Sequence, residues 1–174
     1  FIATNRIESA PGYQPVLAQW AEMELAVADE FRDGNVGAQT ELLGVTKRAF
    51  AALPETVEEF CFRGGSACYE QMLMKWLRNR QREGGPESFI GVGISARMSE
   101  SLRDKIRMLP EAGWRAYRED AQVTCEYAEL PWDPMERKVD EVLDQVRYLV
   151  IRVRQRQGGL FEDGTRSRHF AVVT

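Results

Sequence analysis

The first 110 residues alternate short apolar runs with segments whose apolar positions follow a helical period. Two short apolar segments separated by Glu22-Met23-Glu24 predict an antiparallel β-hairpin, and Asp33-Gly34-Asn35 predicts the turn that ends it. The predicted ranges are 14–20 and 25–31 for the hairpin strands, then 38–53 for a helix, 57–62 for a strand, 67–83 for a helix, 89–94 for a strand and 99–109 for a helix. This order is typical of an α/β layer.

Cap and breaker residues bound the predicted helices. Pro54 and Pro110 follow two of them, and Gly84-Gly85-Pro86 stops the one between. Ser66 and Ser99 precede helices, and we expect both serines to cap a first turn.

The remainder of the chain reads differently. Strands are predicted at 114–118, 122–130, 147–154 and 168–173, with a polar and partly helical stretch at 131–144. This half is therefore predicted to be a β-rich addition to the α/β layer.

Composition narrows the class of protein. With 174 residues and 44% hydrophobic side chains, the chain is long enough for one compact unit with its own core. Three widely spaced cysteines, Cys61, Cys68 and Cys125, favour reduced thiols and a cytoplasmic setting. No apolar run reaches the length of a membrane span and no signal peptide opens the chain, so we expect no association with a membrane. The first residue is Phe1 rather than Met, so we expect a piece of a longer protein.

Charge is distributed in blocks. The net charge of −4 combines acidic blocks at 1–71 and 119–144 with basic blocks at 72–118 and 145–174. Most of the 23 basic residues are arginines. A GC-rich genome would explain this bias, and so would a surface that faces phosphate, because the guanidinium fork matches phosphate oxygens.

Several motifs fit structural roles better than chemical ones. His169 is expected to be an ordinary core or surface histidine, and no Cys or His pair has the spacing of a zinc site. Gly91-Val92-Gly93 lies inside a predicted strand and does not lead into a phosphate-binding helix. Gly64-Gly65-Ser66-Ala67-Cys68 lacks the spacing of a nucleophile elbow, which leaves helix capping for Ser66.

Four segments taken in order carry a family resemblance. They are Gly12-Tyr13-Gln14-Pro15-Val16, Asp29-Glu30-Phe31-Arg32-Asp33-Gly34-Asn35-Val36, Phe62-Arg63-Gly64-Gly65-Ser66-Ala67 and Arg168-His169-Phe170-Ala171-Val172-Val173-Thr174. The set resembles the core of DDE-type insertion-sequence transposases, which have an RNase H-like fold. The resemblance covers nearly the whole chain.

The resemblance implies metal-dependent cutting and joining of transposon ends. In the family, two Asp and one Glu hold two divalent ions, usually Mg²⁺ or Mn²⁺, at the scissile DNA phosphate. The first Asp is expected before Phe1 and the Glu beyond Thr174. The second belongs to an Arg-x-Asp-Ser element, which reads Arg63-Gly64-Gly65-Ser66 in this chain. With Gly65 at the expected Asp position, no catalytic carboxylate is intact, so we expect an inactive chain that binds these metals poorly.

The resemblance also implies a domain organisation: residues 1–110 as a partial RNase H-like core, 111–165 as a β-rich insertion subdomain, and 166–174 as a strand returning to the core. Such insertions contact transposon-end DNA. Candidate phosphate contacts lie on one helix face and on alternate positions of one strand, where they share a face. They are Lys75, Arg78, Arg82, Arg152, Arg154 and Arg156. Plain solvent-facing charge is the alternative for both sets.

Two other functions stay open. One is a catalytically dead DNA-binding remnant, and the other is a non-enzymatic interaction domain. In the family, the first Asp lies on a strand that would precede Phe1 and lie inside the sheet. Without that strand, backbone groups at a sheet edge would be unpaired, and a neighbouring copy of the chain could cover them. We therefore also expect homo-oligomers.

Overall fold

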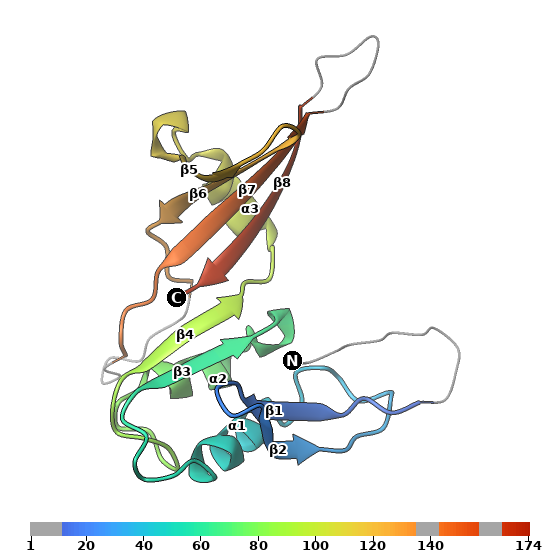
Figure 1. The fold of residues 1–174 in the computed structure, drawn as a ribbon, viewed down its shortest axis with the longest axis vertical. Helices are drawn as coiled ribbons and strands as arrows, with labels where there is room; N and C mark the ends of the chain where they lie inside the picture. Colours follow the sequence, from blue (N-terminus) through green and yellow to red (C-terminus); the bar gives the residue numbers. More distant parts are fainter. Residues whose placement is uncertain (1–11, 135–142, 157–164) are drawn as a thin grey trace. The chain divides into compact units, whose positions relative to one another are not determined.

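The computed structural model describes residues 12–134, 143–156 and 165–174 (Figure 1). The chain forms two compact units. The N-terminal unit comprises Phe1–Ile94 with Met135–Gln145, and the C-terminal unit comprises Ser95–Pro134 with Val146–Thr174.

The N-terminal unit begins with the predicted antiparallel hairpin. β1 (Val16–Trp20) pairs with β2 (Leu25–Glu30), and an isolated bridge between Tyr13 and Asp33 extends the pairing. Glu24 adopts a left-handed conformation with φ of 56° in the tight turn between the strands. The hairpin prediction is confirmed.

Two helices supply most of the core of this unit. α1 (Leu42–Ala51) packs against both hairpin strands, and α2 (Gln71–Arg78) packs against α1 (Figure 1). The Phe50 ring centre of α1 lies 5.7 Å from that of Trp76 on α2 and 5.8 Å from that of Phe60. Apolar side chains of α2 are completely enclosed: Leu73, Met74 and Leu77.

A second pair of strands lies parallel. β3 (Phe60–Gly64) pairs in parallel with β4 (Ile90–Ser95), and the short 3-10 helix η1 (Ser66–Cys68) and α2 connect them. Within the part of the chain that the structure describes, β3 pairs with β4 alone. The other edge of β3 therefore carries backbone groups without a strand partner.

The helix predicted at 67–83 is wrong at its start. Ser66 is the first residue of η1, whose N-cap is Gly65, and the N-cap of α2 is Glu70. The Glu70 carboxylate instead accepts hydrogen bonds from the backbone N–H groups of Met72 and Leu73, both at 2.9 Å. An acidic side chain at this position satisfies the free N–H groups and also suits the helix dipole.

The same helix ends earlier than predicted. α2 stops at Arg78, and the loop that follows folds back so that the Arg82 guanidinium donates to the backbone oxygens of Trp76 and Leu77, each at 3.0 Å. These are carbonyl groups that a helix leaves unpaired at its C-terminus. Arg82 thus belongs to the loop after the helix rather than to a solvent-facing helical stripe.

The C-terminal unit is an antiparallel sheet with one helix. α3 (Glu100–Arg107) starts at Ser99, whose hydroxyl accepts from the Leu102 N–H at 3.2 Å, so the predicted cap is confirmed. The short 3-10 helix η2 (Glu111–Gly113) leads into the sheet. The four strands lie in the order β8-β7-β6-β5, and their bounds are β5 (Arg115–Glu119), β6 (Val123–Leu130), β7 (Tyr148–Arg156) and β8 (Thr165–Val173).

One sheet face changes character along the strands. Near α3, alternate strand residues and two α3 residues are buried and apolar: Tyr148, Val150, Ala171, Val173, Ala128, Leu130, Leu102 and Ile106. Two residues further along β7, Arg152 takes the place of Val150, opposite His169 of β8 and Glu126 of β6. The same face is therefore an apolar core at one end and a charged surface at the other.

The architecture confirms a mixed α/β fold whose later half is β-rich. α3 belongs to the same unit as the strands that follow it. The domain division at residues 110 and 165 stays a prediction. Of the stretch expected to be partly helical, residues 131–134 and 143–144 form no helix, and 135–142 lie outside the described residues.

Candidate functional site

Gly65 lies immediately after β3, at the carboxyl end of the parallel strand pair. Its backbone is extended, and an added Cβ would meet no atom within 4 Å. Arg63 and Ser66 beside it are exposed. None of these residues offers a carboxylate, so the two divalent ions of the transposase family do not fit the residues present at this strand end.

Metal-ligating side chains do not gather elsewhere in residues 12–134, 143–156 and 165–174. No group of three His, Cys, Asp or Glu residues in these ranges could hold a metal ion. The three cysteines are free thiols, and burial raises the pKa of Cys68.

The two helix arginines proposed as phosphate contacts are bound internally. Arg78 is 1% exposed and donates to the backbone oxygen of Asp144 at 2.7 Å. Arg82 is 6% exposed and, besides capping α2, donates to the backbone oxygens of Pro86 and Ser88. Burial lowers the pKa of Arg82. The protein's own carbonyl groups therefore occupy both guanidiniums, whereas Lys75 is only half-buried on α2.

The strand arginines form a shared ion-pair cluster in the C-terminal unit. Arg152 Nε donates to Glu126 at 2.7 Å, and its two terminal nitrogens donate to the two Glu111 carboxylate oxygens at 2.9 and 2.8 Å. Arg154 pairs with the same two carboxylates. Their common face, expected from alternation along the strand, is confirmed. Arg156 ends β7, and its side chain lies outside the described residues.

Trp114 covers this cluster. The Arg152 guanidinium carbon lies 4.1 Å from the centre of the indole ring, which is the geometry of a cation–π contact. The His169 ring centre lies 5.9 Å from the indole. The Arg152 side chain is 8% exposed and Glu126 is 15% exposed, whereas Glu111 is 70% exposed. The cluster thus has one buried carboxylate and one open to solvent.

The pKa shifts follow from this arrangement. Hydrogen bonds from Arg152 and Arg154 lower the pKa of Glu111 to about 2. Burial works to lower the pKa of Arg152, but its bonds to Glu111 and Glu126 outweigh burial and raise it. Burial, together with the charges of Arg152 and Arg154, lowers the pKa of His169. At neutral pH these shifts favour a neutral His169 beside ionised Arg152 and Glu111.

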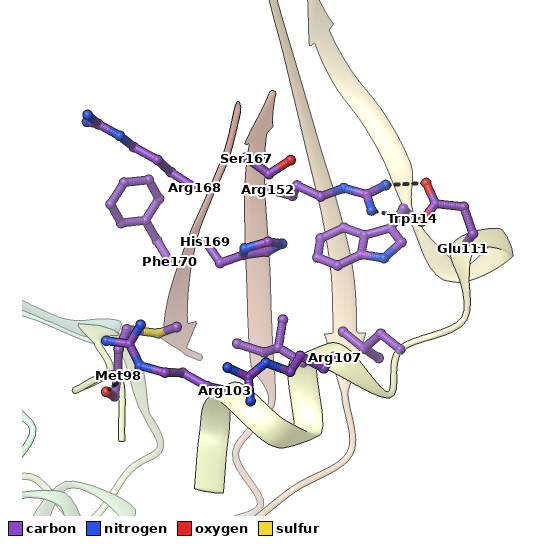
Figure 2. A pocket seen from close by; sticks show the side chains of 12 residues that line it. Met98, Arg103, Arg107, Glu111, Trp114, Arg152, Ser167, Arg168, His169 and Phe170 are labelled. Atoms are coloured by element: carbon purple, nitrogen blue, oxygen red, sulfur yellow. Dashed lines mark hydrogen bonds and ion pairs between the residues drawn. The ribbon is translucent and has the colours of Figure 1, made fainter. Parts of the chain in front are cut away.

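A cavity of about 610 Å³ opens beside the cluster, between α3, η2 and the sheet (Figure 2). We call it the basic pocket. Its charged lining residues are Arg103, Arg107, Arg152, Arg168 and Glu111. Figure 2 shows His169 and Arg152 directed toward Trp114, while Arg168 and Phe170 leave β8 on its other side.

Sequence reasoning missed the carboxylates and the indole of this site. Glu126 lies directly opposite Arg152 in the β6–β7 register, and the hydrophobic pattern does not fix that register. Glu111 is the first residue of η2, and Trp114 directly follows η2. Glu111 lies 41 positions before Arg152 in the sequence. The basic block at 72–118 was the one available signal for Arg103 and Arg107.

None of the described helices is both long and apolar enough to cross a membrane. No protein family matches the chain, and neither a curated protein nor a solved structure is significantly similar to it.

Proposed function

We propose that this chain is an interior part of a DDE-type DNA transposase and binds DNA. The resemblance of four ordered segments supports the assignment, and one structural observation carries it furthest. The N-terminal unit contains an antiparallel hairpin, β1–β2, and a parallel pair, β3–β4, as two separate sheets. In the family's RNase H-like sheet one further strand lies between these pairs, so their separation in the described residues supports the proposal.

The position of Gly65 supports the same proposal. Carboxyl ends of parallel strands meet at one edge of a sheet, which is where ligands gather in α/β folds. Gly65 occupies that edge after β3, level with the end of β4. In the parent enzyme an Asp at this position would hold metal, while in this chain the glycine leaves the site without its ligand.

DNA contact is proposed for the C-terminal unit, where exposed arginines gather. Arg103 and Arg107 lie on α3, and Arg168 lies on β8. Arg154 on β7 has a partly exposed side chain as well. Phosphate contacts of this kind give affinity without reading sequence.

Two assays test this function. A labelled DNA duplex at about 50 mM salt should bind the chain, because phosphate contacts are strongest at low ionic strength. Incubation of the same DNA with Mg²⁺ or Mn²⁺ should leave it uncut, because Gly65 stands where the second metal-binding Asp is expected. Absence of binding would remove the DNA function, and cutting that copurifies with the folded chain would show that the carboxylate assignment is wrong.

A non-enzymatic interaction domain is the second candidate function, and the edge of β3 with which no described strand pairs favours it. An unpaired strand edge is a template for pairing with another chain. Sedimentation separates the candidates: concentration-dependent dimers with no DNA affinity favour the interaction domain, and DNA affinity in a monomer favours the transposase part.

A further inference from the structure

The geometry points to a phosphate-binding site in the basic pocket, with Glu111 as an internal carboxylate that the phosphate displaces. The site lies entirely within the C-terminal unit. It goes beyond the transposase proposal and does not depend on it, since it concerns only the side chains of this unit.

The two carboxylates of the cluster play different parts. Glu126 lies within β6, opposite Arg152, and is largely buried, so it holds the arginine in place. Glu111 lies on a one-turn 3-10 helix and is mostly exposed. Water reaches the exposed Glu111 carboxylate far more than the Glu126 carboxylate, so Glu111 leaves the cluster more easily than Glu126.

The bonds that Glu111 makes show what would replace it. Its two oxygens accept two parallel hydrogen bonds from the terminal nitrogens of Arg152, and one of them also accepts from Arg154. This is the bidentate geometry in which a guanidinium binds two phosphate oxygens. Glu111 therefore stands where a phosphate group would bind.

The surroundings favour an anion larger than a carboxylate. Glu111 is the one acidic group among the residues that line the pocket, and Arg103, Arg107 and Arg152 line it as well. Arg168 also borders the pocket, but its side chain leaves β8 on the other side. Arg107 forms an ion pair with the exposed Asp104 on its own helix at 2.6 Å. The cavity of about 610 Å³ lies within the usual size of small-ligand pockets. A free phosphate, a nucleotide and a nucleic-acid strand share the group that this site recognises.

His169 provides a direct readout, because it is the only histidine in the chain and lines the pocket. Its ring signals can be followed by NMR at constant pH during titration with inorganic phosphate, deoxythymidine 5′-monophosphate or a short single-stranded oligonucleotide. We expect a saturable shift, and the arm with the highest affinity identifies the source of the phosphate.

Charge variants test the displacement. Glu111→Gln should bind about two- to fivefold more tightly, since the competing ion pair is gone. The double variant Arg103→Gln/Arg107→Gln should bind about three- to tenfold more weakly. Arg118→Gln is the matched control, because Arg118 is exposed on β5 in the same unit and does not line the pocket. This variant should bind phosphate as tightly as the parent chain.

If the His169 signals do not shift in any of the three titrations, the pocket does not bind phosphate. If Glu111→Gln and Arg118→Gln bind phosphate with equal affinity, phosphate does not displace Glu111. The same experiments separate failure of this site from failure of the transposase proposal. Binding of phosphate in the pocket without binding of duplex DNA would support this site and contradict the DNA-binding function.

Discussion

Arg152 shows how a single side chain can carry both stability and chemistry. Its guanidinium is enclosed by Trp114, Glu126 and Glu111, at the point where the buried face of the sheet turns from apolar to charged. A nearly buried charge is tolerated only when it is paired and hydrogen-bonded. The cluster therefore stabilises the sheet by pairing a buried charge. Its exposed side is the surface at which we propose that phosphate binds.

Removal of the buried carboxylate should destabilise the fold. We expect Glu126→Gln to lower the free energy of unfolding by about 1–3 kcal/mol, because Arg152 would lose its charged partner within the sheet. Glu129→Gln is the control on the same strand: Glu129 is 58% exposed and pairs with Arg147 at the surface, so the change should be below about 1 kcal/mol. Urea unfolding measures both, and equal losses would contradict the structural role of Glu126.

His169 should titrate below the usual histidine range. Its pKa is lowered in the folded state, while in the unfolded chain it is close to 6.5. As pH falls below the unfolded value, the unfolded state gains the proton first, so His169 should reduce stability in that range and have no such effect above it. NMR titration should give a pKa below 6.5, and Arg154→Gln should raise it. A native pKa at or above the ordinary value would show that burial and the arginine charges do not act on this ring.

Substitution should destabilise the fold at Gly64 but hardly change its stability at Gly65. A Cβ at Gly64 would lie 2.6 Å from the Cys68 Sγ, whereas a Cβ at Gly65 meets nothing within 4 Å. We expect Gly64→Ala to cost about 1–3 kcal/mol of stability through overpacking, and Gly65→Asp to change it by no more than about 0.5 kcal/mol. Thermal unfolding of both variants tests whether residue 65 has room for the carboxylate that the family places there. A strongly destabilised Gly65→Asp would deny that room.

Sequence patterns identified part of this residue-level picture. The alternation of Arg152 and Arg154 predicts a shared face, because side chains on a strand repeat every two residues. Nothing in the pattern marks Glu111, since it reaches Arg152 from a turn distant in sequence. For Arg78 and Arg82 the sequence pattern predicts exposed side chains, because charged residues usually face solvent. Their guanidiniums instead donate to backbone carbonyl groups inside the unit.

At the scale of elements, strands and most helices followed from the hydrophobic pattern. The hairpin, β3 and β4, and the four strands of the later half lie close to the predicted ranges. α2 is the exception, because capping by Glu70 and the folded-back Arg82 shorten it at both ends. Capping at those positions depends on tertiary contacts, which local propensity does not contain.

The cap of α2 gives a prediction at this scale. Glu70→Ala should cost about 1 kcal/mol, because two backbone N–H groups lose their acceptor. Ser66→Ala should change stability by no more than about 0.5 kcal/mol, since the N-cap residues of η1 and α2 are Gly65 and Glu70. Chemical denaturation of both variants makes the comparison, and a larger loss for Ser66→Ala would restore the serine as the cap.

At the scale of the whole molecule, the α/β class followed from the order of elements, but the division into units did not. α3 joins the β-rich unit because Leu102 and Ile106 are buried there, a contact that chain order alone does not reveal. The hairpin and the β3–β4 pair lie in separate sheets, which supports the proposed transposase core, whereas the β3 edge with which no described strand pairs favours the interaction domain. Both are properties of strand pairing and lie beyond any local motif.

The salt dependence of DNA binding tests the central claim most directly. If Arg103, Arg107 and Arg168 each contact a phosphate, the affinity for duplex DNA should fall roughly 40-fold between about 50 and 200 mM salt. The double variant Arg103→Gln/Arg107→Gln should flatten that dependence, and Arg118→Gln should preserve it. An affinity that does not change with salt, or that the double variant leaves intact, would contradict the proposed DNA-binding role.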